Sequence, residues 1–138
     1  MPIVTKVRDV MNRKLISVDV KASVRDAVNR MIEKDIGSVV VTREGKPVGI
    51  LTERDVLKKV ISTRRGPMDP SLIKAEDVMT TPLITIDAEA SLGEASMLMV
   101  KNNIRRLLVT EDGNIVGIFT NKDLLKGTLG AFMVLSSV

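Results

Sequence analysis

The chain has 138 residues, 44% of them hydrophobic and 28% charged, and this balance predicts one folded domain or two halves that share a core. It contains no Cys and no His, which excludes disulfide frameworks, thiolate and imidazole catalysis and most zinc sites. The net charge is only +4 and the aromatic residues are two Phe, so the stacking platforms of single-strand nucleic-acid binders are missing.

Neither end of the chain has the pattern of a membrane segment. The first ten residues are interrupted by Lys6, Arg8 and Asp9, so they lack the apolar core of a signal peptide. The apolar tail, residues 129–138, has about half the length that a membrane span requires. We expect this tail to pack on the core or on a second chain, with disorder as the alternative, and we expect a cytoplasmic protein.

The first part of the chain predicts a strand, a helix and a second strand. Residues 15–18 form the first short strand, and Ser23 is placed to cap a helix. The apolar residues of this helix follow the spacing i, i+3, i+4, i+7 and i+8, and they are Val24, Ala27, Val28, Met31 and Ile32. Residues 39–41 are all Val and predict the next strand.

The following part predicts a β-hairpin and a second helix. A turn over residues 43–46 leads into a return strand over residues 48–51. The second helix begins near Thr52, and its apolar face consists of Val56, Leu57, Val60 and Ile61. Residues 62–71 contain Gly66, Pro67 and Pro70 and are typical of a connector.

The whole pattern then repeats at a shift of 68 residues. There are 20 identities in the 49 pairs that begin at Asp9–Asp77 and end at Leu57–Leu125, where chance would give about three or four. One copy would be marginal alone, so we expect two β-α-β-β-α units of an α/β (α+β) class to bury one surface between them about a pseudo-two-fold axis. The predicted boundaries are 1–66 for the first unit, 67–73 for the connector and 74–138 for the second unit with its apolar tail.

The junction between the return strand and the second helix carries the most informative residues. In the first copy they are Thr52, Arg54 and Asp55, and in the second copy Thr120, Lys122 and Asp123. The first turn of a helix suits an anion, the basic residue adds a positive charge, and a carboxylate can accept from two neighbouring hydroxyls, as on a ribose. The alternative is that Thr-x-x-Asp only caps the helix, and the two interpretations are compatible.

A second difference between the copies lies just before the buried strand. The first copy has Gly37 and Ser38 there, and the second has Arg105 and Arg106. Two adjacent guanidinium groups either form a solvated edge or suit a phosphate. We find no defensible pair of catalytic carboxylates and no metal-ligand cluster, so no catalytic residue and no metal site is predicted.

The Asp-Val-Met start of each copy, its Leu-Ile first strand and its Gly-Ile-Leu/Phe-Thr-x-Arg/Lys-Asp end resemble a tandem pair of CBS domains, a Bateman module, over residues 7–126. The resemblance implies two units packed sheet to sheet, with two clefts that bind adenosyl compounds such as AMP, ADP, ATP or S-adenosylmethionine. It also implies a homodimer, and a regulated protein, not identified by the sequence, that reads the conformational change.

Carried onto this chain, the resemblance assigns twelve residues to the two clefts. The Thr and Asp would hold phosphate or ribose, and the backbone of the first strand would read the adenine edge. One cleft would combine Thr52, Arg54 and Asp55 with Ile84, Arg105 and Arg106. The other would combine Thr120, Lys122 and Asp123 with Ile16, Gly37 and Ser38. Because only the first contains the Arg pair, we expect it to bind a nucleotide phosphate more tightly, so that Asp55→Ala weakens binding more than Asp123→Ala.

The sequence therefore predicts a stand-alone adenine-nucleotide-sensing module, with AMP as the first candidate ligand, and no enzyme. One alternative is a nucleic-acid-binding protein, favoured by the pI of 9.6 and opposed by the small net charge and the few aromatic residues. Another alternative is a dimerisation scaffold with empty clefts. A membrane partner is not expected.

Overall fold

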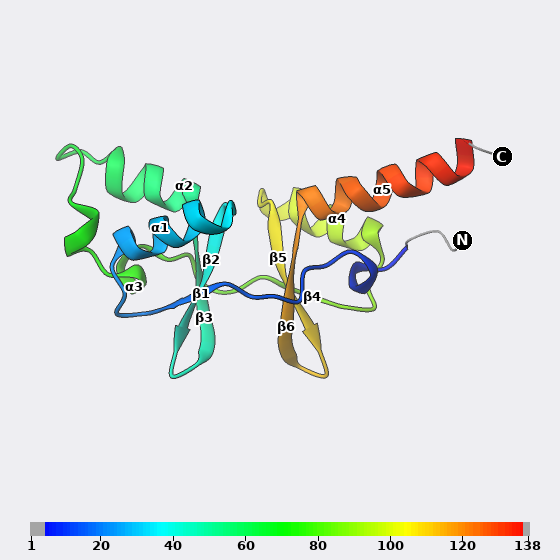
Figure 1. Ribbon diagram of the computed structural model, residues 1–138, viewed down its shortest axis with the longest axis horizontal. Helices are drawn as coiled ribbons and strands as arrows, with labels where there is room; N and C mark the ends of the chain where they lie inside the picture. Colours follow the sequence, from blue (N-terminus) through cyan, green and yellow to red (C-terminus); the bar gives the residue numbers. More distant parts are fainter. Residues whose placement is uncertain (1–4, 137–138) are drawn as a thin grey trace. The chain divides into compact units, whose positions relative to one another are not determined.

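The computed structural model describes residues 5–136, which form two three-stranded sheets and five α-helices, so the predicted mixed α+β class is confirmed (Figure 1). The chain divides into two compact units. We call residues 16–83 the central unit, and residues 1–15 with 84–138 the terminal unit. Within residues 5–136, no helix is both long enough and apolar enough to cross a lipid bilayer.

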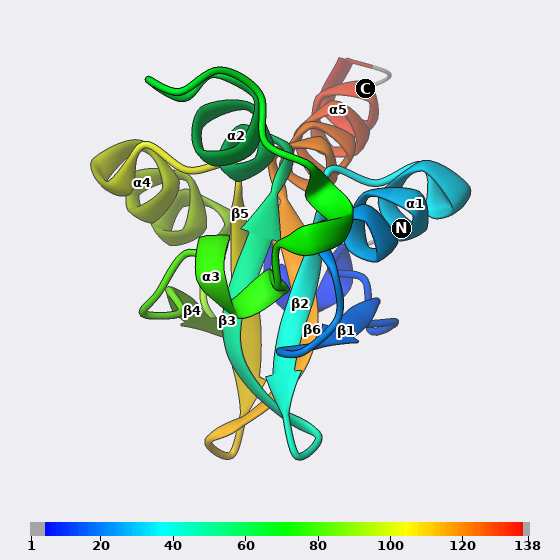
Figure 2. The same ribbon diagram turned by 90° about the vertical axis from the view of Figure 1, so that its left-hand side faces the viewer.

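The sheet of the central unit has the order β1-β2-β3. β1 pairs parallel with β2, which pairs antiparallel with β3. Its elements are β1 (Ser17–Asp19), α1 (Val24–Lys34), β2 (Ser38–Arg43), β3 (Lys46–Thr52), α2 (Glu53–Val56), the π-helical turn η2 (Leu57–Ile61), the 3-10 turn η3 (Pro70–Leu72) and α3 (Ala75–Val78). Helix α1 packs against β2 and α2 against β3, and α3 also reaches β3, as seen where this unit faces the viewer (Figure 2).

The terminal unit has the same sheet, with β4-β5 parallel and β5-β6 antiparallel. Its elements are the 3-10 turn η1 (Val7–Asp9), β4 (Thr85–Asp87), α4 (Leu92–Asn102), β5 (Arg106–Glu111), β6 (Asn114–Thr120) and α5 (Asn121–Ser136). The predicted apolar tail continues as the backbone of α5 up to Ser136. Its side chains from residue 130 onward lie outside the described part of the chain, and so do residues 137 and 138.

Local signals in the sequence explain where these elements begin and end. Ser23 caps α1 by accepting from the Asp26 N–H at 3.0 Å, and Ser91 caps α4 by accepting from the Glu94 N–H at 3.0 Å. The hairpin turn Glu44–Gly45 has φ values of 51° and 78°, which is the geometry of a type I′ turn. The predicted helices and hairpins are therefore present in both copies.

Each unit has a core of its own, filled by many of the apolar positions that the repeat predicted, but Ile32, Leu57 and Ile61 of the predicted helix faces are exposed. In the central unit Val24, Val41 and Leu51 have no exposed surface. In the terminal unit Val109 and Phe119 are equally buried. Leu51 and Phe119 are equivalent residues of the two copies, so the second core accommodates a ring where the first has a branched aliphatic chain.

The compact units are composed differently from the repeats in the sequence. The leading segment, residues 5–15, packs in the terminal unit, where the Val7 N–H donates to Ala90 at 2.9 Å and Asn12 bridges to Ile118. The middle segment, residues 69–83, packs in the central unit, where the Ala75 N–H donates to Ala22 at 2.7 Å. The leading segment, which precedes β1, thus completes the sheet and helices of the second copy. The middle segment, which precedes β4, completes those of the first copy.

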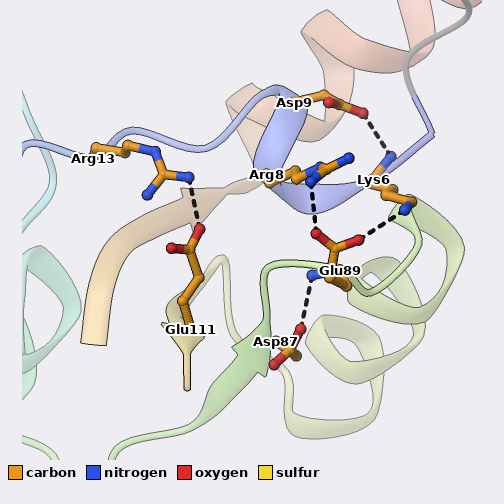
Figure 3. A network of polar contacts seen from close by, with 7 residues as sticks. All are labelled: Lys6, Arg8, Asp9, Arg13, Asp87, Glu89 and Glu111. Atoms are coloured by element: carbon orange, nitrogen blue, oxygen red, sulfur yellow. Dashed lines mark hydrogen bonds and ion pairs between the residues drawn. The ribbon is translucent and has the colours of Figure 1, made fainter. Parts of the chain in front are cut away.

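Ion pairs of opposite polarity accompany the two segments. In the terminal unit the leading segment is basic: Lys6 and Arg8 contact Glu89 at 2.7 and 2.8 Å (Figure 3). Arg13 of the same segment contacts Glu111 at 2.7 Å. In the central unit the middle segment supplies the acid instead, because Glu76 contacts Lys21 at 3.3 Å and Arg43 at 3.2 Å.

Candidate functional site

The junction of β3 and α2 places Thr52 and Asp55 against each other. The backbone of Thr52 is extended, with φ −112° and ψ 162°, so its side chain faces the first turn of α2. Its Oγ1 accepts from the Asp55 N–H at 3.1 Å, and Oδ2 of Asp55 accepts from the Thr52 N–H at 3.0 Å and from the Thr52 hydroxyl at 3.1 Å. This is a capping box, so the capping interpretation of Thr-x-x-Asp is confirmed here.

The same box is built where β6 meets α5. Oδ2 of Asp123 accepts from the Thr120 N–H at 2.9 Å and from the Thr120 hydroxyl at 3.1 Å. The Asp123 N–H donates back to the Thr120 hydroxyl oxygen at 3.3 Å. Both junctions therefore hold a carboxylate at the end of a strand, beside the first N–H groups of a helix, where an anion or a hydroxyl-bearing ligand can bind.

Asp55 has two further partners that the sequence did not predict. Its Oδ1 accepts from the Thr80 hydroxyl at 2.7 Å and lies 3.1 Å from Nζ of Lys59. The Lys59 amine also donates to the carbonyl of Val78 at 2.9 Å. The i, i+4 spacing of Asp55 and Lys59 on a helix was a usable signal for the ion pair. Thr80 lies 25 residues away in the sequence, and only the packing of the middle segment brings it to Asp55.

The residues before the buried strands lie next to these junctions within each unit. Ser38 is buried and pairs with Thr52 across the sheet, and the Gly37 carbonyl accepts from the Glu53 N–H at 3.0 Å. In the terminal unit Arg106 pairs with Thr120, and the Arg105 carbonyl accepts from the Asn121 N–H at 2.9 Å. The two sequence features that we singled out are thus brought together in each copy.

The twelve candidate residues divide evenly between the units. The central unit contains Ile16, Gly37, Ser38, Thr52, Arg54 and Asp55, and the terminal unit contains Ile84, Arg105, Arg106, Thr120, Lys122 and Asp123. The side chains of Arg54, Arg105 and Lys122 are exposed. The carbonyls of Ile16 and Ile84 accept sheet hydrogen bonds from Val40 and Leu108 at 2.9 and 3.1 Å. The predicted grouping of these residues into two clefts stays a prediction.

Comparison with known proteins gives a consistent result. The family model described as the CBS domain matches twice, over residues 7–62 and 75–130. An uncharacterized protein of Methanopyrus kandleri, MK0525, is 37% identical over 122 residues, which are 87% of this chain but only 61% of that protein. The chain therefore spans less than two thirds of this curated relative.

Two solved structures are similar over almost their whole length. An uncharacterized conserved protein from Pyrococcus horikoshii is 36% identical with a TM-score of 0.83, and the match covers 93% of this chain and 95% of that one. The CBS domain pair of protein MJ0100, in complex with 5′-methylthioadenosine and S-adenosyl-L-methionine, is 26% identical with a TM-score of 0.78, over 92% of this chain and 98% of that one.

Proposed function

The chain belongs to the CBS-domain family as a tandem pair of CBS domains, and we propose that it is a regulatory module that binds an adenosine-containing ligand, with AMP as the first candidate. The observation that carries the proposal is the capping box at each strand end, where a carboxylate and a hydroxyl lie beside the first N–H groups of a helix. Such a carboxylate can accept hydrogen bonds from the hydroxyls of a ribose.

Charge supports a ligand that carries phosphate. The basic residues Arg54 and Lys122 stand two positions after the capping Thr of each copy. The Arg105–Arg106 pair adds two guanidinium groups in the terminal unit, which suit a phosphate by their fixed fork of donors. The similar MJ0100 pair binds 5′-methylthioadenosine and S-adenosyl-L-methionine, so these two compounds and the adenine nucleotides are the candidates to compare.

In this proposal the ligand acts by shifting a conformational equilibrium that a partner protein reads. A ligand shifts such an equilibrium only by its differential affinity for the two states. The predicted homodimer and the predicted cytoplasmic location remain predictions. Exposed apolar side chains on α4, among them Met97 with 72% and Val100 with 76% of their surface accessible, are a surface that a second copy could cover.

Thermal unfolding with added ligand tests the proposal. AMP, ATP, S-adenosylmethionine and 5′-methylthioadenosine are each compared with GMP and with 2′-deoxy-AMP. A ligand at 100 times its Kd stabilises the native state by about 2.7 kcal/mol, which raises the Tm by several degrees for a chain of this length.

We expect AMP to raise the Tm more than GMP and more than 2′-deoxy-AMP. If no adenosine compound shifts the Tm at millimolar concentration, the proposal is wrong. Retention on duplex DNA that falls steeply with salt would then favour the nucleic-acid alternative. Absence of both effects would leave the dimerisation scaffold.

A further inference from the structure

The two equivalent carboxylates differ in how many hydrogen bonds they already accept. Asp55 has only 6% of its surface exposed. Its Oδ2 accepts from the N–H and the hydroxyl of Thr52 at 3.0 and 3.1 Å. Its Oδ1 receives the Thr80 hydroxyl at 2.7 Å and the Lys59 amine at 3.1 Å. Four donors therefore surround this one carboxylate, and we call Thr80 and Lys59 its internal donors.

Among the described residues of the terminal unit, Asp123 has the equivalents of two of these four donors. Its Oδ2 accepts from the N–H and the hydroxyl of Thr120 at 2.9 and 3.1 Å. Within the described part of the terminal unit, its Oδ1 accepts no hydrogen bond. The carboxylate is also less deeply buried than that of Asp55.

The sequence explains why the internal donors are missing at Asp123. At the 68-residue shift, Gly127 occupies the position of Lys59 and Asn12 occupies the position of Thr80. Gly127 has no side chain. The backbone of Asn12 bridges to Ile118 as that of Thr80 bridges to Ile50, but its side-chain Oδ1 accepts from the Lys14 N–H at 2.9 Å.

Counting acceptor positions shows what each carboxylate can still bind. An ionised carboxylate offers about four lone-pair positions on its two oxygens. At Asp55 all of them have donors, whereas the hydrogen bonds described within the terminal unit leave about two at Asp123. A ribose brings two adjacent hydroxyl donors, so Asp123 can accept both while keeping its capping box. Asp55 could accept them only if the Thr80 hydroxyl and the Lys59 amine moved away.

We propose that Lys59 and Thr80 weaken ligand binding at Asp55 by occupying its Oδ1, so that of the two equivalent carboxylates Asp123 is the one left to accept a ribose diol. This inference rests on the proposed function and names the copy that carries its ribose specificity. It reverses the ranking expected from the Arg105–Arg106 pair, because it depends on the acceptors left at each Asp and not on the nearby positive charge.

Isothermal titration of the full chain with AMP and with 2′-deoxy-AMP tests the ranking. Asn keeps one acceptor oxygen for the capping box, so Asp123→Asn and Asp55→Asn are matched substitutions. We expect Asp123→Asn to weaken AMP binding by roughly 10- to 100-fold, the effect of losing hydrogen bonds to a charged group. It should also abolish the preference for AMP over 2′-deoxy-AMP. Asp55→Asn should weaken AMP binding less and should keep the preference.

Removal of the internal donors tests the second half of the proposal. Lys59→Met with Thr80→Val keeps the side-chain volumes and removes both donors. We expect this double variant to gain a second AMP site, so that the measured stoichiometry rises from one to two. Lys58→Met is the matched control, because it removes the same charge from an exposed neighbouring position of the same helical segment. It should titrate like the wild type, and the Tm of every variant is measured to confirm folding.

Three results would overturn the inference. The first is a loss of AMP binding that is greater in Asp55→Asn than in Asp123→Asn. The second is a preference for AMP over 2′-deoxy-AMP that survives in Asp123→Asn. The third is an unchanged stoichiometry in the folded double variant. If the wild type binds no adenosine compound, the proposed function fails instead. The occupancy of Asp55 is then judged by ¹⁵N NMR of the Lys59 ammonium group. Slow proton exchange that is lost in Asp55→Asn supports the occupancy, and fast exchange in the wild type overturns it.

Discussion

Two glycines allow the leading and middle segments to approach the strands on which they pack, Gly117 in β6 and Gly49 in β3. A Cβ on Gly117 would lie 2.7 Å from the backbone carbonyl oxygen of Asn12, and a Cβ on Gly49 would lie 2.5 Å from Sδ of Met79. The first neighbour is backbone that is itself hydrogen-bonded to Ile118 at 2.9 Å, so it cannot move without breaking the bridge. The second neighbour belongs to a flexible side chain, which can change its rotamer, and the nearest backbone atom, the Thr80 carbonyl oxygen, would lie farther away at 3.2 Å.

These equivalent glycines therefore differ in their tolerance of a methyl group. We expect Gly117→Ala to lower the free energy of unfolding by about 1–3 kcal/mol, as overpacking does, and Gly49→Ala to lower it less. Urea unfolding of the two variants and the wild type, with the same m value, measures the difference. An equal or larger effect of Gly49→Ala would contradict the role assigned to the Asn12 backbone.

At the residue scale the sequence predicted what depends on near neighbours. The capping boxes of Thr52 and Thr120 follow from a spacing of three residues, and both are confirmed. Thr80 could not be identified as a partner of Asp55, because its approach depends on where the middle segment packs. No periodicity or spacing contains that information.

At the scale of elements, charge distinguishes two segments whose apolar residues are nearly the same. The leading segment contributes Arg8 against Glu89, whereas the equivalent pair in the central unit is Glu76 against Lys21, with the signs reversed. If each segment packed on the body of its own copy, Arg8 would face Lys21 and Glu76 would face Glu89. Like charges at these positions oppose that arrangement, so the ion pairs favour the exchanged one.

The glutamates of these ion pairs, Glu76 and Glu89, are held ionised by their basic partners. The hydrogen bond from Lys21, with a smaller contribution from Arg43, holds the pKa of Glu76 below its usual value. The hydrogen bond from Lys6 and the charge of Arg8 do the same for the pKa of Glu89. Because the pKa is lowered on folding, the stabilisation is present above the unfolded pKa of about 4.3 and is lost as the pH falls through the lower folded value.

Reversal of one charge tests the contribution of these pairs. Glu76→Lys places a third cation beside Lys21 and Arg43, so we expect a lower Tm at pH 7. Glu33→Lys, at an exposed position of α1, is the control for the change in net charge. Adding Lys21→Glu to Glu76→Lys restores one opposite-charge pair and should recover part of the Tm. The difference should shrink in 1 M salt, where the Debye length is about 3 Å, and a Tm drop equal to that of Glu33→Lys would exclude the charge argument.

At the scale of the whole molecule, each unit needs residues from two distant parts of the chain. The central unit is completed by Ala75 and Val78 of the middle segment, and both are buried in its core. The terminal unit is completed by Val7, which has no exposed surface. The repeat made the two bodies predictable from sequence. It could not show which segment completes which body, because Val10–Met11 and Val78–Met79 are identical in the two copies.

A fragment of the chain tests this dependence. Residues 1–66 contain one complete repeat but lack the middle segment, so we expect the fragment alone to be largely unfolded, since a repeat of this length is marginal even when its core is intact. Mixing it with residues 67–138 should restore structure, because together the two fragments contain both segments and both bodies. Circular dichroism and proton NMR distinguish the states, and a cooperative thermal transition of fragment 1–66 alone would contradict the prediction.

The crossing of the two segments has a consequence for any protein that contained just one of these repeats. Its leading segment would fit the sheet and helices of a neighbouring repeat and not its own. Such a protein could therefore complete its core only by exchanging leading segments with an identical chain, as a domain-swapped dimer. When the two repeats are joined in one chain, the exchange of segments takes place within that chain. The leading and middle segments can then carry charges of opposite sign, because each segment has to fit only one of the two sheets.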